Sequence, residues 1–348
     1  MTTAGAGAEI YVSAPASVPD VYVPAKVSSG DFTWIGWDGT RWPLTDPRAQ
    51  TAVMLAPGVR GLGMPAKNVN VKASVLSAGG RYVDHHDESR EVFLPVRVYS
   101  RPGQDWLDYD AAFFRTLRTD RPGVLEYRSP GQAVRRLALR FVDDSEHVVE
   151  SLGGQWGRQT YGLRFIAERP YWTSDPVLRV FTAAQAANWL GGGPVGQQGA
   201  GPPFVFGSAN SLARARITNP GNHAVRPEII AAGPFTSLEV GVGGKVDRAD
   251  FAVPQGKALV IDGSPDAGYV VDADVVTTLD GDIHFDPTTG YMGVTNFGTP
   301  GGPGDRFRDM TSVAFAAVPP GANVPLTIRM TGTGTVQVAL VPAWDRAW

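Results

Sequence analysis

The chain lacks cysteine altogether, since none of its 348 residues is Cys. Disulfides, thiolate metal sites and cysteine nucleophiles are therefore excluded. A run of 18 apolar residues is also missing, and positions 1–8 lack the basic and apolar regions of a signal peptide. We expect no membrane insertion and no secretory leader. The absence of Cys agrees with synthesis in a reducing cytoplasm.

An excess of charge of one sign is missing as well. Lys and Arg number 31 against 34 Asp and Glu, which leaves a formal net charge of −3. Because nucleic-acid-binding domains are usually strongly basic, we expect no general nucleic-acid-binding surface. Glycine and proline are instead abundant, with 42 and 28 residues and no collagen-like period. This composition is typical of many turns between short strands.

Alternating apolar and polar residues predict strands through the first half of the chain. Aromatic runs at 32–37 and 41–44 flank Asp38-Gly39, which is a strong hairpin signal. Alternation also predicts that each such strand has one buried face and one wet face. Further strands are expected at 8–14, 20–27, 69–76, 91–99, 123–127, 133–142 and 157–168.

A single helix is expected at about 105–118, with Asp105 as its N-cap. Helical spacing predicts a buried stripe made of Leu107, Ala111, Phe114 and Leu117. The first half is therefore expected to be a sheet or small barrel with one helix packed on it.

The composition changes at residues 170–206, where a run rich in Gly, Pro and Gln begins at Gly191. Such a run buries little apolar surface and predicts a linker or exposed loop. We therefore divide the chain into an N-terminal barrel-like domain at 1–172, a linker at 173–206 and a C-terminal domain at 207–348. The C-terminal domain is expected to be a β-sandwich. Its strands are expected at 213–218, 225–231, 235–242, 249–253, 257–262, 268–272, 290–296, 312–316, 325–330 and 335–341.

The clusters that carry possible chemistry are better explained as turns. Asp84-His85-His86-Asp87-Glu88 is the sharpest of them, but neighbouring strand residues point to opposite faces, so we interpret it as a polar hairpin tip. The pairs Asp143-Asp144 and Asp280/Asp282 lack the facing geometry of glycosidase carboxylates. EF-hand spacing is missing around Asp272, and the glycines at 193–199 lack the spacing of a dinucleotide loop. We predict no catalytic residues, no cofactor and no metal site.

Two other groups of residues point to contacts. Arg136 and Arg140 fall on the solvent-facing side of strand 133–142. One interpretation is a charged face that is simply solvated; the alternative is that the two arginines line a channel or contact another subunit. Trp344 and Trp348 stand at the end of the chain. Since terminal residues are loose unless docked, two aromatics there predict a tail pinned on its own domain or on a partner.

Three stretches of the sequence resemble the distal tail proteins of siphophages, especially those that infect actinobacteria. The first runs from Gly79-Gly80-Arg81 to EVFLPVRVY at 91–99 and the following helix. The second is ITNPGNHAVRP at 217–227. The third runs from VPPGAN at 318–323 to VQVALVPAW at 336–344. Their order and spacing, rather than any one motif, carry the resemblance.

The resemblance implies a mainly β fold with an N-terminal barrel-like domain and a C-terminal galectin-like sandwich. It also implies a structural virion protein at the tail tip, a hexameric ring of identical subunits that joins the tail tube protein to tail-tip or baseplate proteins. Genome DNA would only pass through the ring, and no enzyme activity is expected. The alternatives are a module that binds host cell-wall saccharide through an exposed Trp on a sheet face, and a wall hydrolase.

Overall fold

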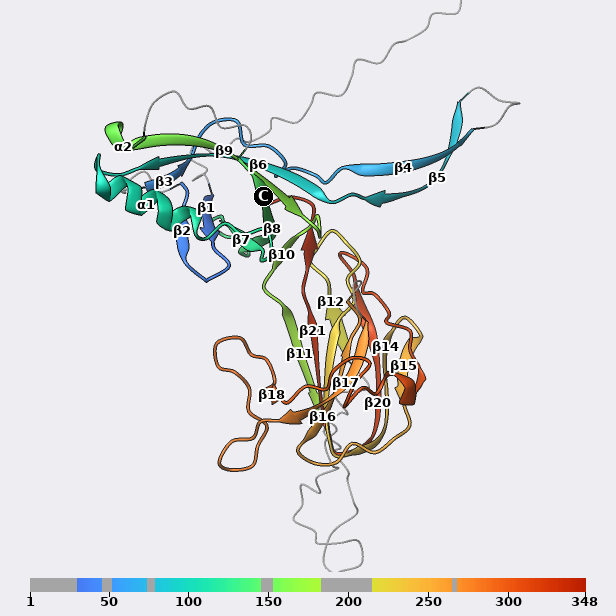
Figure 1. Ribbon diagram of the computed structural model, residues 1–348. Coiled ribbons are helices and arrows are strands. Elements are labelled where there is room, and N and C mark those ends of the chain that lie inside the picture. The colour runs from blue at the N-terminus through green and yellow to red at the C-terminus, as the bar shows by residue number, and fades with distance from the viewer. Residues whose placement is uncertain (1–29, 46–51, 74–78, 145–152, 183–214, 265–267) are drawn as a thin grey trace, which may run out of the picture.

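The computed structural model describes residues 30–45, 52–73, 79–144, 153–182, 215–264 and 268–348. The chain forms a barrel-like N-terminal body, a β-sandwich below it and a two-stranded arm that projects sideways (Figure 1). The mainly β fold class predicted from the sequence, with one substantial helix, is confirmed. The strands expected at 8–14 and 20–27 lie outside the described residues.

The N-terminal body is a curled antiparallel sheet in the order β2-β1-β7-β8-β9-β6-β3. The two ends of this sheet approach each other, because the Leu55 N–H donates to the Leu44 carbonyl at 2.9 Å. Inward-facing residues such as Trp34, Leu139 and Phe165 form its core. The strands are β1 (Asp31–Ile35), β2 (Arg41–Pro43), β3 (Ala52–Leu55), β6 (Arg90–Tyr99), β7 (Gly123–Arg128), β8 (Arg135–Asp143) and β9 (Arg158–Ala167).

Local sequence signals account for most of these strands. Asp38-Gly39 forms the turn between β1 and β2, and Gly39 adopts a φ of 82°, which a residue without Cβ tolerates. On β8, Leu137 and Leu139 are fully buried while Ala138 between them is exposed, as the alternation predicted.

The helix α1 (Gln104–Phe114) buries only part of the predicted stripe. Trp106 and Phe113 are buried, whereas Leu107 is 50% exposed. The predicted stripe was therefore wrong for Leu107 and Ala111, which are exposed, but Phe114 packs against the core and Leu117, just beyond the helix, is buried in it. The N-cap is Gly103 rather than Asp105.

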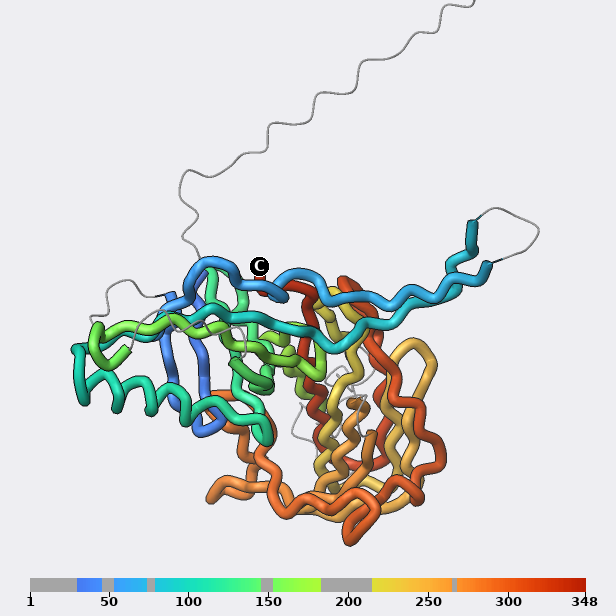
Figure 2. The backbone as a smooth tube through the Cα atoms, turned by 45° about the horizontal axis from the view of Figure 1, so that its top comes forward, coloured from blue at the N-terminus to red at the C-terminus, as the bar shows by residue number. Residues whose placement is uncertain are grey.

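Two strands leave the N-terminal body as a ribbon, which we call the arm. β4 (Lys67–Ala73) and β5 (Gly80–Asp87) pair with each other and with no other described strand. Every residue of β4 is exposed, so the expected buried face of strand 69–76 was wrong for its described part. The cluster at 84–88 begins on β5 instead of forming a hairpin tip. Figure 2 shows the arm extending clear of the body.

The sandwich packs a six-stranded sheet, β11-β21-β13-β16-β17-β18, on a five-stranded sheet, β12-β20-β14-β15-β19. Ile229, Leu238 and Leu259 lie in the core between them. The strands are β11 (Val177–Thr182), β12 (Arg216–Thr218), β13 (Glu228–Ala232), β14 (Phe235–Val242), β15 (Lys245–Ala249), β16 (Lys257–Asp262), β17 (Tyr269–Val275), β18 (Val294–Thr295), β19 (Met310–Ser312), β20 (Asn323–Gly332) and β21 (Thr335–Leu340).

The first residues of the expected linker, at 173–182, lie mostly in β-strands. β10 (Trp172–Ser174) joins the N-terminal sheet through β8, and β11 pairs along its whole length with β21 of the sandwich. The rest of the range 173–206 lies outside the described residues from position 183 onward. The strand expected at 249–253 was also misplaced, because β15 ends at Ala249. The division into two domains stays a prediction.

The outer face of the six-stranded sheet is covered by the chain itself. Residues in the range 276–294 contribute Met292 to a second buried cluster with Ile230 and Val260. The fully buried Gln337 fixes this cover, because its Nε2 donates to the Gly290 carbonyl and its Oε1 accepts from the Met292 N–H, both at 2.8 Å.

Residues 343–348 return to the N-terminal body, and we call them the clasp. Their strand β22 (Ala343–Trp344) pairs with β10, so the end of the chain extends the N-terminal sheet. Ala347 is fully buried in the core of the N-terminal body. The prediction of a pinned tail is confirmed, and the tail docks on the body where the chain begins rather than on the sandwich.

The Trp344 side chain packs at this docking. Its Nε1–H donates to Ser174 Oγ at 3.2 Å, and the Arg135 guanidinium carbon lies 4.2 Å from the centre of its ring. Trp348, in contrast, is 52% exposed and contacts Tyr127 edge-on.

Trp344→Ala is expected to lower the free energy of unfolding by about 2–3 kcal/mol, because it removes a packed aromatic ring, a hydrogen bond and a cation–π contact. Trp348→Ala is the matched control, with an expected loss below about 1 kcal/mol. Urea denaturation of both variants would measure the difference. Equal losses would contradict the role given to Trp344.

Candidate functional site

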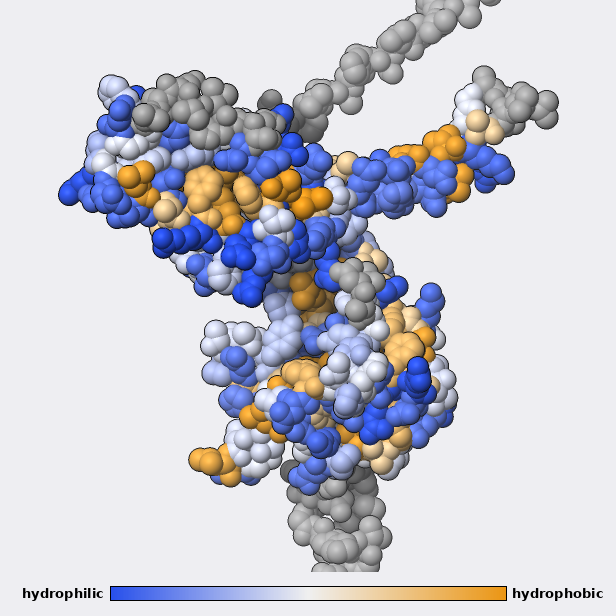
Figure 3. All heavy atoms as spheres, in the orientation of Figure 1, coloured by the Kyte–Doolittle hydropathy of each residue, from blue (hydrophilic) through white to orange (hydrophobic). Residues whose placement is uncertain are grey.

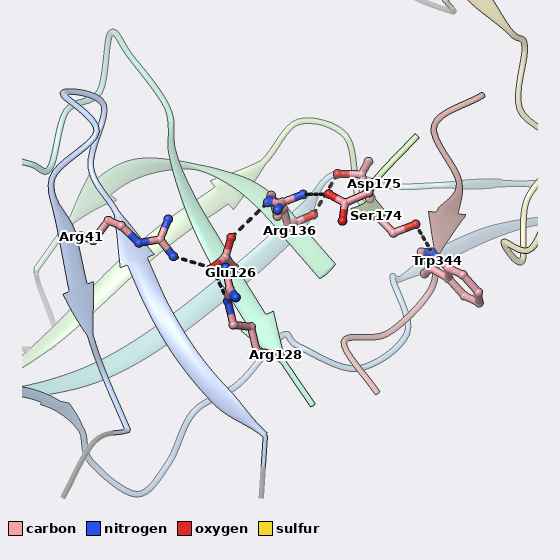
Figure 4. Close-up of polar contacts among 8 residues, drawn as sticks. Arg41, Glu126, Arg128, Arg136, Ser174, Asp175 and Trp344 are labelled. Carbon is pink, nitrogen blue, oxygen red and sulfur yellow. Dashed lines mark hydrogen bonds and ion pairs between the residues drawn. The ribbon is translucent and has the colours of Figure 1, made fainter. Parts of the chain in front are cut away.

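The carboxylate of Glu126 on the N-terminal sheet is surrounded by three guanidinium groups (Figure 4). Its Oε1 accepts from Arg41 at 2.5 Å and from Arg128 at 2.9 Å, and its Oε2 accepts from Arg136 at 3.1 Å. Cross-strand pairing produces this group, since Glu126 on β7 stands opposite Arg136 on β8. The Glu126 side chain is only 2% exposed, while the three arginines are 36–57% exposed.

The electrostatics of this cluster favour the charged carboxylate. Burial by itself raises the pKa of Glu126, but the hydrogen bonds from Arg128, Arg41 and Arg136 outweigh burial and lower it. The carboxylate is shielded by the guanidinium groups rather than by depth in the core. Arg136 pairs with Asp175 as well, so the three guanidinium groups share two carboxylates.

The same arginine leads to the junction with the sandwich. Arg136 also donates to Asp175 at 2.6 Å, just beyond β10. Ser174 beside it accepts the indole N–H of Trp344 (Figure 4). Arg136, which the sequence placed on a wet face, therefore connects the N-terminal sheet to the start of β11, and Arg140 pairs with Glu168 at 2.7 Å.

Arg90 is the buried cation of the junction, with an exposure of 3%. It donates to the carbonyls of Pro170 at 2.8 Å, Gly61 at 3.0 Å and Asp345 at 2.7 Å, and also to that of Gly63. These carbonyls belong to the segment before the arm, the segment before β10, and the clasp. One guanidinium therefore fixes three distant segments.

The arm is anchored beside Arg90 by a second polar group. Asp87, the last residue of β5, accepts from Lys67 at 2.6 Å and from the Tyr171 hydroxyl. Burial opposes ionisation of Asp87, but the hydrogen bonds from Lys67 and Tyr171 lower its pKa overall. His223 stacks on Tyr171 with ring centroids 3.9 Å apart and its Nε2 lies 2.8 Å from Asp345. The base of the arm is thus tied to the sandwich.

Beyond its base the arm exposes apolar side chains. Val69, Val71, Tyr82 and Val83 are each 50–55% exposed. Figure 3 shows this apolar surface on the arm, separated from the body by hydrophilic residues. Such a patch on a projecting element is typical of a protein contact.

The residue clusters that the sequence offered as candidate catalytic or metal sites have structural roles. His85 and His86 pair with Val69 and Asn68 across the arm and therefore lie on opposite faces, as expected. Among the described residues, no group of three or more His, Asp, Glu or Cys is placed to hold a metal ion. Asp143 pairs with Arg164 on β9.

The acidic residues in the turns and strands of the sandwich also have structural roles. Asp280-Gly281-Asp282 forms a tight turn, with Gly281 at a φ of 86°. Asp272 pairs with Arg306 and Asp274 with Lys257, so neither carboxylate is free for a cation. The Gly-rich range 193–199 lies outside the described residues.

Sequence reasoning missed a carboxylate pair in the sandwich. Glu228 on β13 and Asp262 on β16 lie directly opposite each other, and among the described residues no basic side chain forms an ion pair with either. Burial and the Asp262 charge raise the pKa of Glu228. No local pattern predicts the pair, because only the sheet register brings the two residues together.

No helix of the described residues has the length and apolar character needed to cross a bilayer. No family model and no curated protein matches the sequence. Solved structures with the same fold are found among phage tail proteins. The crystal structure of the Dit protein of phage SPP1, described as a paradigm of the hub adsorption apparatus in phages that infect Gram-positive bacteria, covers 90% of this chain and 98% of its own. The TM-score is 0.51 and the sequence identity 14%.

The fold is that of a Dit-like distal tail protein. The phage P2 baseplate in its activated conformation supplies two further matches, one with Ca and one with Sr, each with a TM-score of 0.50 and 12% identity. Each covers 91% of this chain and 99% of the matched chain. The resemblance noted in the sequence is thus confirmed at the level of the fold.

Glu126→Gln is expected to destabilise the protein by about 2 kcal/mol at pH 7, because it leaves three guanidinium groups without their carboxylate; the half-exposed arginines keep the loss below that of a deeply buried pair. Since folding lowers the pKa of Glu126 below its ordinary 4.5, its contribution is present above pH 4.5 and is lost as the pH falls through the folded-state pKa. Urea denaturation should therefore show wild type and variant converging in acid. Glu168→Gln, at an exposed pair, should change little, and a constant difference at all pH values would contradict the assignment.

Glu228→Gln is expected to stabilise the sandwich by about 0.5–1 kcal/mol at pH 7, because it removes one of two like charges opposite each other. Folding raises the pKa of Glu228, so the wild-type penalty grows as the pH rises above 4.5 and vanishes below it. Melting temperatures from pH 4 to 8 would measure this. Glu239→Gln, which removes a partner of Arg248 and Arg329, is the control and should give no gain.

Proposed function

We propose that this protein is a structural hub of a long-tailed phage, located at the tail tip of the virion and made in the host cytoplasm. Identical subunits form a ring that joins the tail tube to tail-tip or baseplate proteins. The resemblance to the distal tail proteins implies six subunits in this ring. The observation that carries this proposal is the fold likeness to the SPP1 hub protein, which extends over 90% of this chain and 98% of that one. A likeness over both whole chains covers the N-terminal body and the sandwich together.

The surface of the N-terminal body supports self-association. A two-stranded ribbon gains little stability alone in water, yet the arm extends from the body with apolar residues on display. Its base is fixed by Arg90 and Asp87, so it cannot fold back freely onto its own chain. Projecting arms on a rigid body are suited to heterologous contacts that close into a ring.

The passage of DNA through the ring agrees with the overall charge. A conduit should not bind its cargo tightly, and a chain with a formal net charge of −3 offers no general phosphate-binding surface. Enzyme activity is not part of the proposal, because the described carboxylates and histidines that were weighed for chemistry serve in turns, in ion pairs and on the arm.

Saccharide binding by the sandwich has less support. This alternative requires an exposed Trp on a sheet face, and the described strands β11–β21 contain no Trp. The outer face of the six-stranded sheet is also covered by residues of the range 276–294. On the outer face of the other sheet, Glu239 pairs with Arg248 and Arg329.

Light scattering of the purified protein, with negative-stain images of the same fraction, tests the hub function. The expected result is a ring of about six subunits with a central hole. The mass should be followed over a dilution series, because a specific ring dissociates at a defined concentration. A monomer at every concentration would contradict self-assembly and favour the saccharide alternative, which a glycan-binding screen would then examine.

A further inference from the structure

The N-terminal body and the sandwich are connected by two chain segments, at residues 175–176 and 341–342, which we call the hinge. The segments separate β10 from β11 and β21 from β22, and the pairing of the strands stops there (Figure 1). Pro176 and Pro342 lie in the hinge, and proline has no N–H to donate to a strand ladder. Segments at the ends of paired strands can absorb the φ/ψ changes of a domain motion.

No buried apolar cluster of the described residues spans the hinge. The core of the sandwich reaches Phe181 and Leu340, whereas Trp172 and Ala347 belong to the core of the N-terminal body. A rotation at the hinge would therefore leave both cores intact. Domains of one chain are expected to move relative to each other unless a large apolar interface joins them. The polar contacts across the junction therefore decide the orientation of the sandwich.

The turn at residues 219–223 of the sandwich makes such contacts, and we call it the latch. The fully buried Asn219 closes this turn from the inside. Its Nδ2 donates to the carbonyls of His223 at 2.7 Å and Val318 at 3.0 Å. Its Oδ1 accepts from the Gly221 N–H at 2.9 Å. The latch is thus a rigid part of the sandwich and moves with it.

The latch docks on the clasp, which belongs to the N-terminal body. The Asn222 N–H donates to the Ala343 carbonyl at 2.8 Å. The His223 Nε2 lies 2.8 Å from Asp345 Oδ1. A Cβ at Gly221 would lie 2.5 Å from the Ala343 carbonyl oxygen, so a side chain at this position would push the latch away from the clasp.

His223 also contacts the segment before β10. Its ring stacks on Tyr171 with the centroids 3.9 Å apart, and the Tyr171 hydroxyl donates to Asp87. Arg90 fixes this segment and the clasp to the N-terminal body, because it donates to the carbonyls of Pro170 and Asp345. One imidazole therefore contacts two segments that do not belong to the sandwich.

The ion pair at the hinge itself does not hold the sandwich in place. Arg136 donates to Asp175 at 2.6 Å, but Asp175 is a hinge residue whose side chain is 63% exposed. Exposed ion pairs of this kind contribute little free energy.

We propose that the latch holds the sandwich in the orientation of Figure 1, and that the sandwich swings on the hinge as a rigid body when His223 leaves the clasp. The inference concerns a single subunit and goes beyond the ring proposed above. It gives the hub a movable part, because the sandwiches can change direction while the N-terminal bodies keep their contacts. Release breaks a few hydrogen bonds and one ring stack and opens neither core.

Hydrogen exchange of the full chain, read by mass spectrometry, tests the release. The Asn222 amide is protected by the Ala343 carbonyl and exchanges when the latch opens, whereas amides of β8 and β16 exchange when a core opens. His223→Ala should speed exchange in peptides that span 219–223 by about tenfold or more, because a hydrogen bond to a charged group is lost. Peptides of β8 and β16 should keep the wild-type rate. His86→Ala, which removes an exposed histidine of the arm, is the matched control and should change neither.

A distance measurement tests the swing. Because the chain has no Cys, spin labels can be attached at Gln155→Cys in α2 (Gly153–Trp156) and at Lys245→Cys in β15, both of which are exposed. With the latch intact, this pair should give one narrow distance. Gly221→Val/His223→Ala, which pushes the turn off the clasp and removes the imidazole, should give a broad distribution. Labels at Arg179→Cys and Lys245→Cys, both on the sandwich, should keep one distance in every variant and show that the sandwich is folded.

The two measurements separate the latch from the hinge. Exchange at 219–223 that keeps the wild-type rate in His223→Ala, or that rises together with exchange in β8 and β16, would contradict the latch. A narrow distance between Gln155 and Lys245 in the double variant would contradict the swing. Neither result depends on the ring, which light scattering examines separately.

Discussion

The junction of this molecule depends on one buried guanidinium. Arg90 takes its charge out of water, and a buried cation is tolerated only where its donors are satisfied. Its donors reach carbonyls of Gly61, Pro170 and Asp345, which belong to segments far apart in the sequence. Because arginine presents five donors in a fixed, planar arrangement, these segments can satisfy it only when all are in place. The segment before the arm, the segment that leads through β10 toward the sandwich and the end of the chain are therefore ordered together.

The buried contacts around Arg90 also fix the position of the exposed arm. Arg90 begins β6 directly after the arm, and Asp87 at the end of β5 is held by Lys67 and Tyr171. The direction of the arm is thus set by buried polar contacts at its base rather than by contacts along its length. A projecting element whose base is rigid loses little conformational entropy when it binds, which favours assembly through small contacts.

The sequence predicted the parts of the fold that depend on neighbours along the chain. The Asp38-Gly39 hairpin and the alternation on β8 are local signals, and both are confirmed. The clasp was predicted only as a pinned tail, since Trp344 meets Ser174 across 170 residues and no pattern encodes that partner. The Glu228–Asp262 pair was missed for the same reason, because it exists only in the register of β13 and β16. The arm was misjudged because alternation predicts an apolar face but does not say which molecule covers it.

The packing of α1 shows why an apolar stripe can stay at the surface. The helix carries two apolar stripes, one with Trp106 and Phe113 and another with Leu107 and Ala111. Periodicity alone does not choose between them, but buried area does, because each aromatic ring buries about 150–250 Å². The aromatic stripe therefore packs on the barrel, and Leu107 stays at the surface, 50% exposed. A helix with a second apolar stripe has more apolar surface than its own fold buries, and Leu107 and Ala111 are the part of it that stays exposed.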